Sequence, residues 1–383
     1  MKKIVVSSAL SALLVLPAMA FEVYNNDDVK VDVYGSIRGY VGGGMGPSDG
    51  GGDKSKGGYL IGIQNNSTFG AKFQKDKFKA AVEWGAVEPG VDGSGTNWRQ
   101  FWGSYDTGVG TFVFGKINTP TIDNGFTNDF FNNDNGSSGF GGVATGSRRI
   151  QLQYNISGVS VALVEDDIGT GRASEHKESP RIAASYTISD DKGKPLFKVA
   201  GTYRNYSSES KKMMGGSSDS GIAKKSANAF HIWAGFKPTF GSSFLSVMGH
   251  YGMNAHLYGE QLTRKNDGDY GHSSIDVGLD AQRAGVRAEF GTKLSDDMSL
   301  IVGAGYQATF GGESQKAKTN SQKDGFINSY SAFVQLPYKI NSNFTLAPQI
   351  AFYQTTESAK GVQVINGGKE TGVVAAARIR WDF

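Results

Sequence analysis

The stretch TGVVAAARIRWDF, residues 371–383, decides how this chain folds. Counting back from its final residue, every second side chain is apolar, and arginines and an aspartate stand among the residues between them. The apolar positions are Val373, Ala375, Ala377, Ile379, Trp381 and Phe383. Strict alternation is typical of a β-strand with one apolar face and one wet face, whereas helical spacing would place Arg378 beside Val374 and Trp381. The stretch is therefore predicted to be a strand.

The apolar face of this strand carries two aromatic side chains at its end, Trp381 and Phe383. A strand of a water-soluble sandwich would rarely finish on an exposed phenylalanine. Aromatic side chains are enriched where a membrane meets water. We therefore expect Trp381 and Phe383 at a membrane boundary, with the outer face of the strand in lipid.

The first twenty residues read as a targeting segment. Lys2 and Lys3 form a basic start, residues 4–16 are mostly apolar, and Ala18-Met19-Ala20 provides a small-residue cleavage site. This pattern predicts a secretory signal peptide over residues 1–20, which would send residues 21–383 across the inner membrane of a bacterium.

The composition favours many strands and turns. The chain has 54 glycines but 9 prolines, with 23 phenylalanines and 16 tyrosines. It contains no cysteine, which excludes disulfides, thiol catalysis and cysteine-based metal or haem sites. The five histidines form no HExxH-type pair, so we expect no metal site and no cofactor. The net charge of +3 falls to near neutral without Lys2 and Lys3, which gives no case for nucleic-acid binding.

The alternating pattern recurs along the chain and predicts sixteen strands. Seven short turns and eight long loops connect them, and the loops fall at 42–58, 88–96, 118–147, 166–180, 207–226, 259–280, 311–324 and 357–370. In an outer-membrane barrel the short turns face the periplasm and the long loops face outside. The predicted fold class is therefore all-β, a 16-stranded antiparallel transmembrane β-barrel formed by residues 21–383.

Closure and face assignment follow from the bilayer as a solvent. An open sheet would expose unpaired backbone groups along its edges, and each costs several kcal/mol in hydrocarbon. An arginine turned toward the bilayer midplane would cost roughly 2–4 kcal/mol. The inward side chains are therefore predicted to include Arg38, Lys72, Lys79, Glu83, Lys198, Arg204, Arg283, Arg287, Glu289, Arg378 and Arg380. A barrel of sixteen strands leaves an aqueous channel for them.

Several short motifs carry a resemblance to a known family. Glu22-Val23-Tyr24-Asn25 followed by Lys30-Val31-Asp32-Val33-Tyr34-Gly35, the segment Gly141-Gly142-Val143-Ala144-Thr145 and the terminal Phe383 resemble trimeric general diffusion porins of Gram-negative outer membranes. The resemblance implies a homotrimer in outer-membrane lipid and lipopolysaccharide. It also implies delivery to the barrel-assembly machinery through the C-terminal strand. Small outward residues, Gly35, Gly39 and Ala80, would suit packing between barrels.

The resemblance further implies that the third outer loop, about 118–147, folds inward and narrows the barrel. Its carboxylates would then face a basic wall. The acidic side would be Asp123, Asp129 and Asp134, and the basic lumen wall would be Arg38, Arg99, Arg148, Arg149, Arg287, Arg378 and Arg380. Phe126, Phe130, Phe131 and Phe140 would anchor the loop against the wall or stack a sugar.

This chain departs from the family pattern on the basic side of the constriction. Positions where the family places lysine or arginine read Ser36, Thr68 and Gly139, and the Pro-Glu-Phe-Gly-Gly-Asp loop motif is missing. Arg99 stands one residue out of phase with another such position. These departures predict an eyelet that is wider, less polarised or more cation-selective than the family norm.

The function expected from the sequence is a passive, water-filled pore for small hydrophilic solutes and ions. A substrate-specific channel for a sugar or an anion is the nearest alternative. A barrel enzyme is the third. For the enzyme, the sequence offers only the proximity of Ser246 to His250 and His256, so we expect no catalysis and no catalytic residue.

Overall fold

The computed structural model describes residues 20–26, 28–46, 56–64, 66–85, 97–123, 125–130, 140–143, 148–165, 180–191, 193–207, 226–255, 282–310, 325–359 and 369–383. The predicted signal peptide and most of the predicted long loops lie outside these ranges. The described residues contain no helix long and apolar enough to cross a membrane.

The strands of the first half are β1 (Phe21–Asn26), β2 (Val29–Gly46), β3 (Lys56–Ile63), β4 (Thr68–Lys75), β5 (Phe78–Gly85), β6 (Asn97–Asp106), β7 (Thr111–Asn118), β8 (Arg148–Ile156), β9 (Val159–Val164) and β10 (Arg181–Ser189). Those of the second half are β11 (Pro195–Ser207), β12 (Ser226–Phe236), β13 (Thr239–Phe240), β14 (Ser243–Met253), β15 (Gln282–Lys293), β16 (Ser299–Phe310), β17 (Gly325–Gln335), β18 (Tyr338–Lys339), β19 (Phe344–Ala359) and β20 (Lys369–Asp382).

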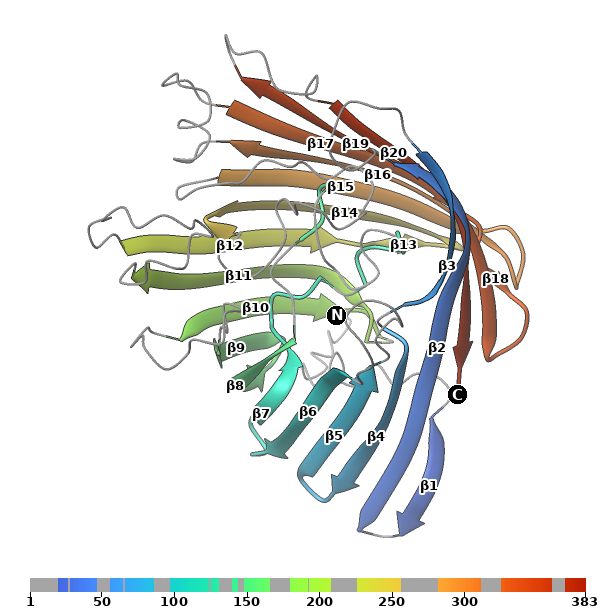
Figure 1. Cartoon of the computed structure of the whole chain (residues 1–383). Helices are drawn as coiled ribbons and strands as arrows, with labels where there is room; N and C mark the ends of the chain where they lie inside the picture. The colour runs from blue at the N-terminus through green and yellow to red at the C-terminus, as the bar shows by residue number, and fades with distance from the viewer. Residues whose placement is uncertain are drawn as a thin grey trace.

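These strands form one closed antiparallel barrel. Strands that follow one another along the chain pair, except that β2 pairs with both β3 and β4, β14 with both β12 and β13, and β19 with both β17 and β18. The last strand, β20, pairs with β2, from Ser36 opposite Asp382 to Met45 opposite Val373. Figure 1 shows the strands following one another in chain order until the red β20 meets the blue β2. The described strands make sixteen crossings, as the sequence predicts, because β3/β4, β12/β13 and β17/β18 are each one crossing in two pieces. β1 is an addition that the sequence did not predict; it pairs with the start of β2.

The interrupted crossings have local causes. Pro238 separates β12 from β13 and Pro337 separates β17 from β18, and proline has no N–H to give to a ladder. Between β3 and β4 the partner is Arg38 of β2. Its backbone N–H donates to Ser67 Oγ at 2.9 Å, and its carbonyl accepts from the Gln64 N–H at 2.8 Å. The break therefore leaves the peptide groups of Arg38 satisfied.

The barrel closes at Gly35 and Phe383. The Gly35 N–H donates to the Phe383 carbonyl at 2.7 Å, and the Phe383 N–H donates to the Gly35 carbonyl at 3.0 Å. A Cβ on Gly35 would collide with the Phe383 ring. Gly35 is therefore small because the terminal ring covers it. This differs from the expectation that it packs against a neighbouring barrel.

Burial alternates along the strands, and the apolar side chains lie on the exposed face. On β15, Arg287 and Glu289 are each 1% exposed, whereas Val286 before them and Phe290 after them are 47% and 38% exposed. The same alternation places Glu83, Arg204 and Arg283 on the buried face, as the sequence predicts. An exterior of exposed apolar side chains is what a lipid-facing surface requires.

The interior is less uniformly polar than the sequence suggests. Buried apolar side chains form one cluster on β5, β6 and β7 and another on β9 and β10. They are Ala81, Trp102, Val113 and Ile117 in the first, and Ala162, Val164 and Ala183 in the second. Ala81 lies opposite Trp102 in register, so these inward side chains contact their cross-strand neighbours.

Candidate functional site

The segment that follows β7 lies against the inner surface of the barrel. Three of its carbonyl groups accept hydrogen bonds from inward-facing side chains of β11, β12 and β14. These bonds are Trp233 Nε1 to Thr121 O at 2.8 Å, Lys198 Nζ to Ile122 O at 2.6 Å and Ser246 Oγ to Phe126 O at 2.6 Å. The Phe126 ring also packs edge-on against Trp233, with ring centroids 5.8 Å apart. The first part of the segment is thereby fixed along one side of the interior.

Side chains of β15 and β19 bind Asp129. Its carboxylate accepts from Arg287 Nη2 at 3.1 Å, from Gln349 Nε2 at 2.6 Å and from Tyr353 Oη at 3.0 Å. The Asp129 side chain is 0% exposed and that of Arg287 is 1% exposed. Arg287 also donates through Nε to Glu289 Oε1 at 3.0 Å. Burial of these charges is tolerated because each is paired and hydrogen-bonded.

Asn128 adds a second set of contacts beside the first. Its backbone N–H donates to Glu289 Oε2 at 2.9 Å and its side-chain amide to the same oxygen at 2.8 Å. Gln335 donates to the Asn128 carbonyl at 3.0 Å and to Gln349 Oε1 at 2.7 Å. We call this group the loop clasp; it consists of Asn128, Asp129, Arg287, Glu289, Gln335, Gln349 and Tyr353.

Phe130 carries the segment to the strands where the barrel closes. Its carbonyl accepts a hydrogen bond at 3.4 Å from Nε2 of Gln64, the residue that follows β3. The guanidinium carbon of Arg378 on β20 lies 5.1 Å from the centroid of the Phe130 ring, a cation–π arrangement. The described part of the segment therefore reaches from β11 round to β20.

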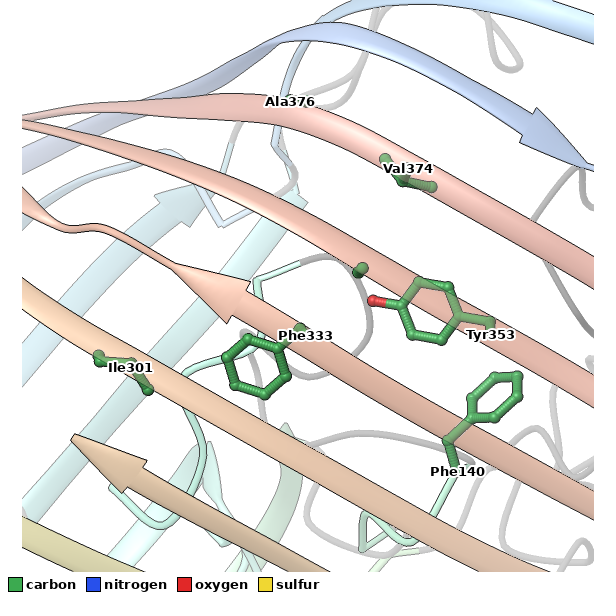
Figure 2. Packing of buried hydrophobic residues seen from close by; sticks show 7 residues of the cluster. Phe140, Ile301, Phe333, Tyr353, Val374 and Ala376 are labelled. Atoms are coloured by element: carbon green, nitrogen blue, oxygen red, sulfur yellow. The ribbon is translucent and has the colours of Figure 1, made fainter.

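Phe140 anchors the last described part of the segment, residues 140–143. Its ring lies 5.2 Å from that of Tyr353, and it packs in an apolar cluster with inward side chains of β16, β17, β19 and β20. Figure 2 shows this packing, with Phe140 opposite Phe333 and Tyr353. The backbone at Phe140 lies close to β16: its carbonyl oxygen occupies the space that a Cβ on Gly305 would need. Phe126, Phe130 and Phe140 are all buried, as anchoring predicts; Phe131 lies outside the described residues.

Acidic and basic groups also meet on the wall formed by β2, β5 and β6. Arg99 Nε lies 3.0 Å from Glu83 Oε1, and Tyr34 Oη donates to Glu83 Oε2 at 3.1 Å. A β-bulge opposite Glu83 and Trp84 places one extra residue in β6. The extra residue shifts the alternation on β6 by one position, and this explains why Arg99 points inward.

Further arginines line the same side of the interior. Arg38 on β2 lies directly opposite Arg380 on β20 in register. Arg380 Nε is 2.8 Å from Asp382 Oδ2, and Arg38 Nε donates to Ser36 Oγ at 2.9 Å. Arg148, at the start of β8, lies within electrostatic reach of Arg38, Arg99 and Glu83. We call this group the basic cluster; it consists of Arg38, Arg99, Arg148, Arg149, Arg378 and Arg380.

The structure divides the residues predicted for the constriction. Asp123 and Asp129 are 0% exposed, so in this structure neither carboxylate lines an open passage, and Arg287 belongs to the clasp that buries Asp129. Asp134 lies outside the described residues. The other predicted arginines form the basic cluster. Sequence alternation places Gln335, Gln349 and Tyr353 on the inward face, but nothing in it shows that they meet Asp129 or Asn128.

The residues weighed for catalysis have other partners. Ser246 Oγ donates to the Phe126 carbonyl, and His250 Nδ1 lies 3.3 Å from His231 Nε2. His256 lies outside the described residues. Ser246 therefore serves to hold the segment after β7.

The fold defines a class of architecture, the closed sixteen-strand antiparallel β-barrel with an apolar outer face and a segment held inside it. No family model matches the chain, and no curated protein matches it. Among solved structures, it is similar to the outer membrane channel DcaP of Acinetobacter baumannii, with 15% identity and a TM-score of 0.65 over 95% of this chain and 100% of that one.

Two further solved structures are similar over almost the whole chain. OmpT, an outer membrane protein of Vibrio cholerae in its trimer form, has 15% identity and a TM-score of 0.54 over 93% of this chain and 100% of its own. OmpF of Salmonella typhi in complex with daunomycin has 12% identity and a TM-score of 0.53 over 95% and 100%. At these identities the likeness shows the fold.

Proposed function

We propose that this chain is an outer-membrane porin that forms a water-filled channel for passive diffusion of small hydrophilic solutes and ions. One observation carries the proposal: a closed sixteen-strand barrel with an apolar outer face holds residues 119–123, 125–130 and 140–143 against its inner wall. A barrel of this strand number encloses an aqueous lumen, and a segment fixed inside it reduces the free cross-section.

Size and charge filtering would arise between this segment and the basic cluster. The clasp fixes the segment on the side of β15, β17 and β19. The basic cluster lies on the strands β2, β6 and β8 and on β20, which pairs with β2. Solutes would pass between the two, and a constriction about one Debye length wide, roughly 8–10 Å, would let wall charges act on every ion that passes.

The remaining parts of the proposal concern assembly. Residues 1–20 would be removed on export, and the C-terminal strand would engage the barrel-assembly machinery. The barrel would sit as a homotrimer among outer-membrane lipid and lipopolysaccharide. OmpT of Vibrio cholerae, which has a trimer form, supports the trimer through its similar fold. Chemical crosslinking in mild detergent tests it: trimers are expected, and monomers alone would contradict it.

Liposome swelling tests the pore directly. Purified protein is reconstituted into liposomes, which are placed in isosmotic solutions of neutral sugars of increasing size. The proposal predicts swelling rates that rise linearly with solute concentration and fall steeply with solute size. Liposomes with heat-unfolded protein provide the control. Swelling that saturates with one solute would favour the substrate-specific channel for a sugar or an anion. The absence of swelling would overturn the proposal.

A further inference from the structure

Three tyrosine hydroxyls on the outer face of the barrel donate hydrogen bonds to amide oxygens of the neighbouring strand. These bonds are Tyr203 Oη to Asn228 Oδ1 at 2.9 Å, Tyr251 Oη to Gln282 Oε1 at 2.6 Å and Tyr306 Oη to Asn328 Oδ1 at 2.8 Å. They join β11 to β12, β14 to β15 and β16 to β17, which follow one another on one side of the barrel (Figure 1). We call this group the tyrosine–amide band; it consists of Tyr203, Asn228, Tyr251, Gln282, Tyr306 and Asn328.

The band lies toward the end of the barrel from which the predicted long loops extend. Tyr203 is near the end of β11 and Asn228 near the start of β12, beside the predicted loop 207–226. The other two pairs lie in the same way beside the predicted loops 259–280 and 311–324. Long loops face outside in an outer-membrane barrel. In the orientation of the proposed porin, the band therefore lies where the outer leaflet meets water.

The direction of the three bonds leaves amide nitrogens on the surface. Each tyrosine hydroxyl donates to the amide oxygen, so the N–H groups of Asn228, Gln282 and Asn328 are not used in the pair. Within the part of the chain that the structure describes, these three amide nitrogens donate to no other group. An amide N–H without an acceptor costs several kcal/mol in hydrocarbon. Whatever covers the band must therefore supply oxygen acceptors.

Aromatic rings lie directly beside these donors. The Tyr306 ring is 5.2 Å from that of Tyr330, its partner in register on β17. Tyr330 in turn lies opposite Gln354 on β19, and Gln354 Nε2 donates to Thr371 Oγ1 on β20 at 3.1 Å. The polar row thus continues from β16 to β20, with ring faces and hydrogen-bonding groups side by side.

Other hairpins carry apolar pairs at the corresponding outward positions. On β5 and β6, Trp84 lies opposite Trp98 with ring centroids 5.0 Å apart. On β9 and β10, Leu163 lies opposite Ile182, and they are 47% and 49% exposed. The end of a barrel strand therefore does not itself require a tyrosine–amide pair, and the band distinguishes one side of the barrel.

We propose, building on the porin function above, that the tyrosine–amide band binds the headgroup of an outer-leaflet glycolipid through its sugar and phosphate oxygens. These oxygens accept hydrogen bonds from neutral amide N–H groups such as those of Asn228, Gln282 and Asn328. Tyrosine combines an apolar ring with a polar tip, which suits a sugar ring that has C–H groups on its faces and hydroxyls at its edge. A phosphatidylethanolamine headgroup has no sugar ring and fewer oxygen acceptors, so it fits the band less well.

Lipid retention in detergent tests the proposal. Folded protein in dodecyl maltoside is mixed with lipopolysaccharide that carries only lipid A and its innermost sugars, or with phosphatidylethanolamine, and bound lipid is measured after gel filtration. The wild-type protein is expected to retain more lipopolysaccharide than phosphatidylethanolamine. In Asn228→Leu/Gln282→Leu/Asn328→Leu, lipopolysaccharide affinity is expected to fall about tenfold or more, because each lost neutral hydrogen bond weakens binding roughly twofold to tenfold. Phosphatidylethanolamine retention should not change.

The matched control exchanges the amides without removing them. Asn228→Gln/Gln282→Asn/Asn328→Gln keeps three amide groups on the same strands and should retain lipopolysaccharide within about twofold of wild type. Gel mobility of unheated samples establishes that both variants are folded. Equal retention of the two lipids by wild type, or undiminished lipopolysaccharide affinity in the leucine variant, would overturn the glycolipid site while a conducting pore leaves the porin function standing. A folded wild-type protein without conductance would instead overturn the porin function.

Discussion

Arg287 on β15 and Asp129 on the segment after β7 form an ion pair at 3.1 Å that is almost entirely excluded from solvent. They are 158 residues apart in the chain, so this contact joins the segment to a distant part of the wall. Glu289 contacts both Arg287 and Asn128, which extends the pair into a network. The contact explains how an irregular segment keeps a fixed position inside a wide barrel.

Breaking this pair should destabilise the barrel. Asp129→Ala removes one partner and leaves Arg287 buried with one carboxylate fewer, a change that typically costs about 3–5 kcal/mol. We expect the free energy of unfolding in denaturant titrations to fall by that order and single-channel current to become noisier. Asp296→Asn, an exposed turn residue, is the matched control and should change neither. A variant as stable and as quiet as wild type would show that the clasp does not position the segment.

The close approach of Phe140 to the barrel wall should require glycine at position 305. Gly305→Ala places a methyl group where the Phe140 carbonyl oxygen lies, so the segment must move away from the wall. We expect altered conductance together with loss of stability. Gly249→Ala, whose added Cβ would make only an ordinary contact at 3.7 Å, is the control. If both variants have the same conductance and stability, the close approach of Phe140 to Gly305 does not affect function.

Closure of the barrel should depend on the space above Gly35. Gly35→Val puts a branched side chain into the Phe383 ring, and the paired backbone bonds of these residues should be lost with it. We expect a lower yield of folded barrel, measured by the mobility difference between unheated and heated samples in gel electrophoresis. Gly58→Ala is the control because its added Cβ meets nothing within 4 Å. Normal folding of the valine variant would contradict the closure described here.

The outward apolar face should tolerate charge in a depth-dependent way. Ile350 is 63% exposed in the middle of β19, and Ile350→Arg is expected to cost roughly 2–4 kcal/mol in lipid vesicles. Tyr59, near the start of β3, is 86% exposed, and Tyr59→Arg should cost about 0–1 kcal/mol. Equal small effects at both positions would mean that this face does not lie in hydrocarbon.

Two-residue alternation was sufficient to predict most of the barrel. It gave sixteen crossings, their order and the inward phase of Arg287 and Glu289, because in a bilayer the two faces of a strand meet opposite solvents. It could not place Arg99, because the bulge opposite Glu83 depends on the neighbouring strand. The split between β3 and β4 also depends on a partner, the backbone of Arg38.

The site was predicted less completely, for a physical reason. The sequence identifies Asp129 as acidic and Arg287 as inward, but a loop without periodicity carries no information about its path. Whether Asp129 faces an arginine across the passage or binds one on the wall beside it depends on tertiary contacts with Gln349 and Tyr353. These contacts make Asp129 an anchor of the segment, whereas the sequence predicts that it lines the constriction.

Single-channel recording of the wild-type protein in a planar bilayer tests the central claim most directly. A closed barrel with a fixed segment beside an open aqueous passage predicts stepwise current increases of uniform size, proportional to voltage and rising with salt concentration. A preparation that is folded by gel mobility and β-sheet circular dichroism but gives no steps would contradict the account.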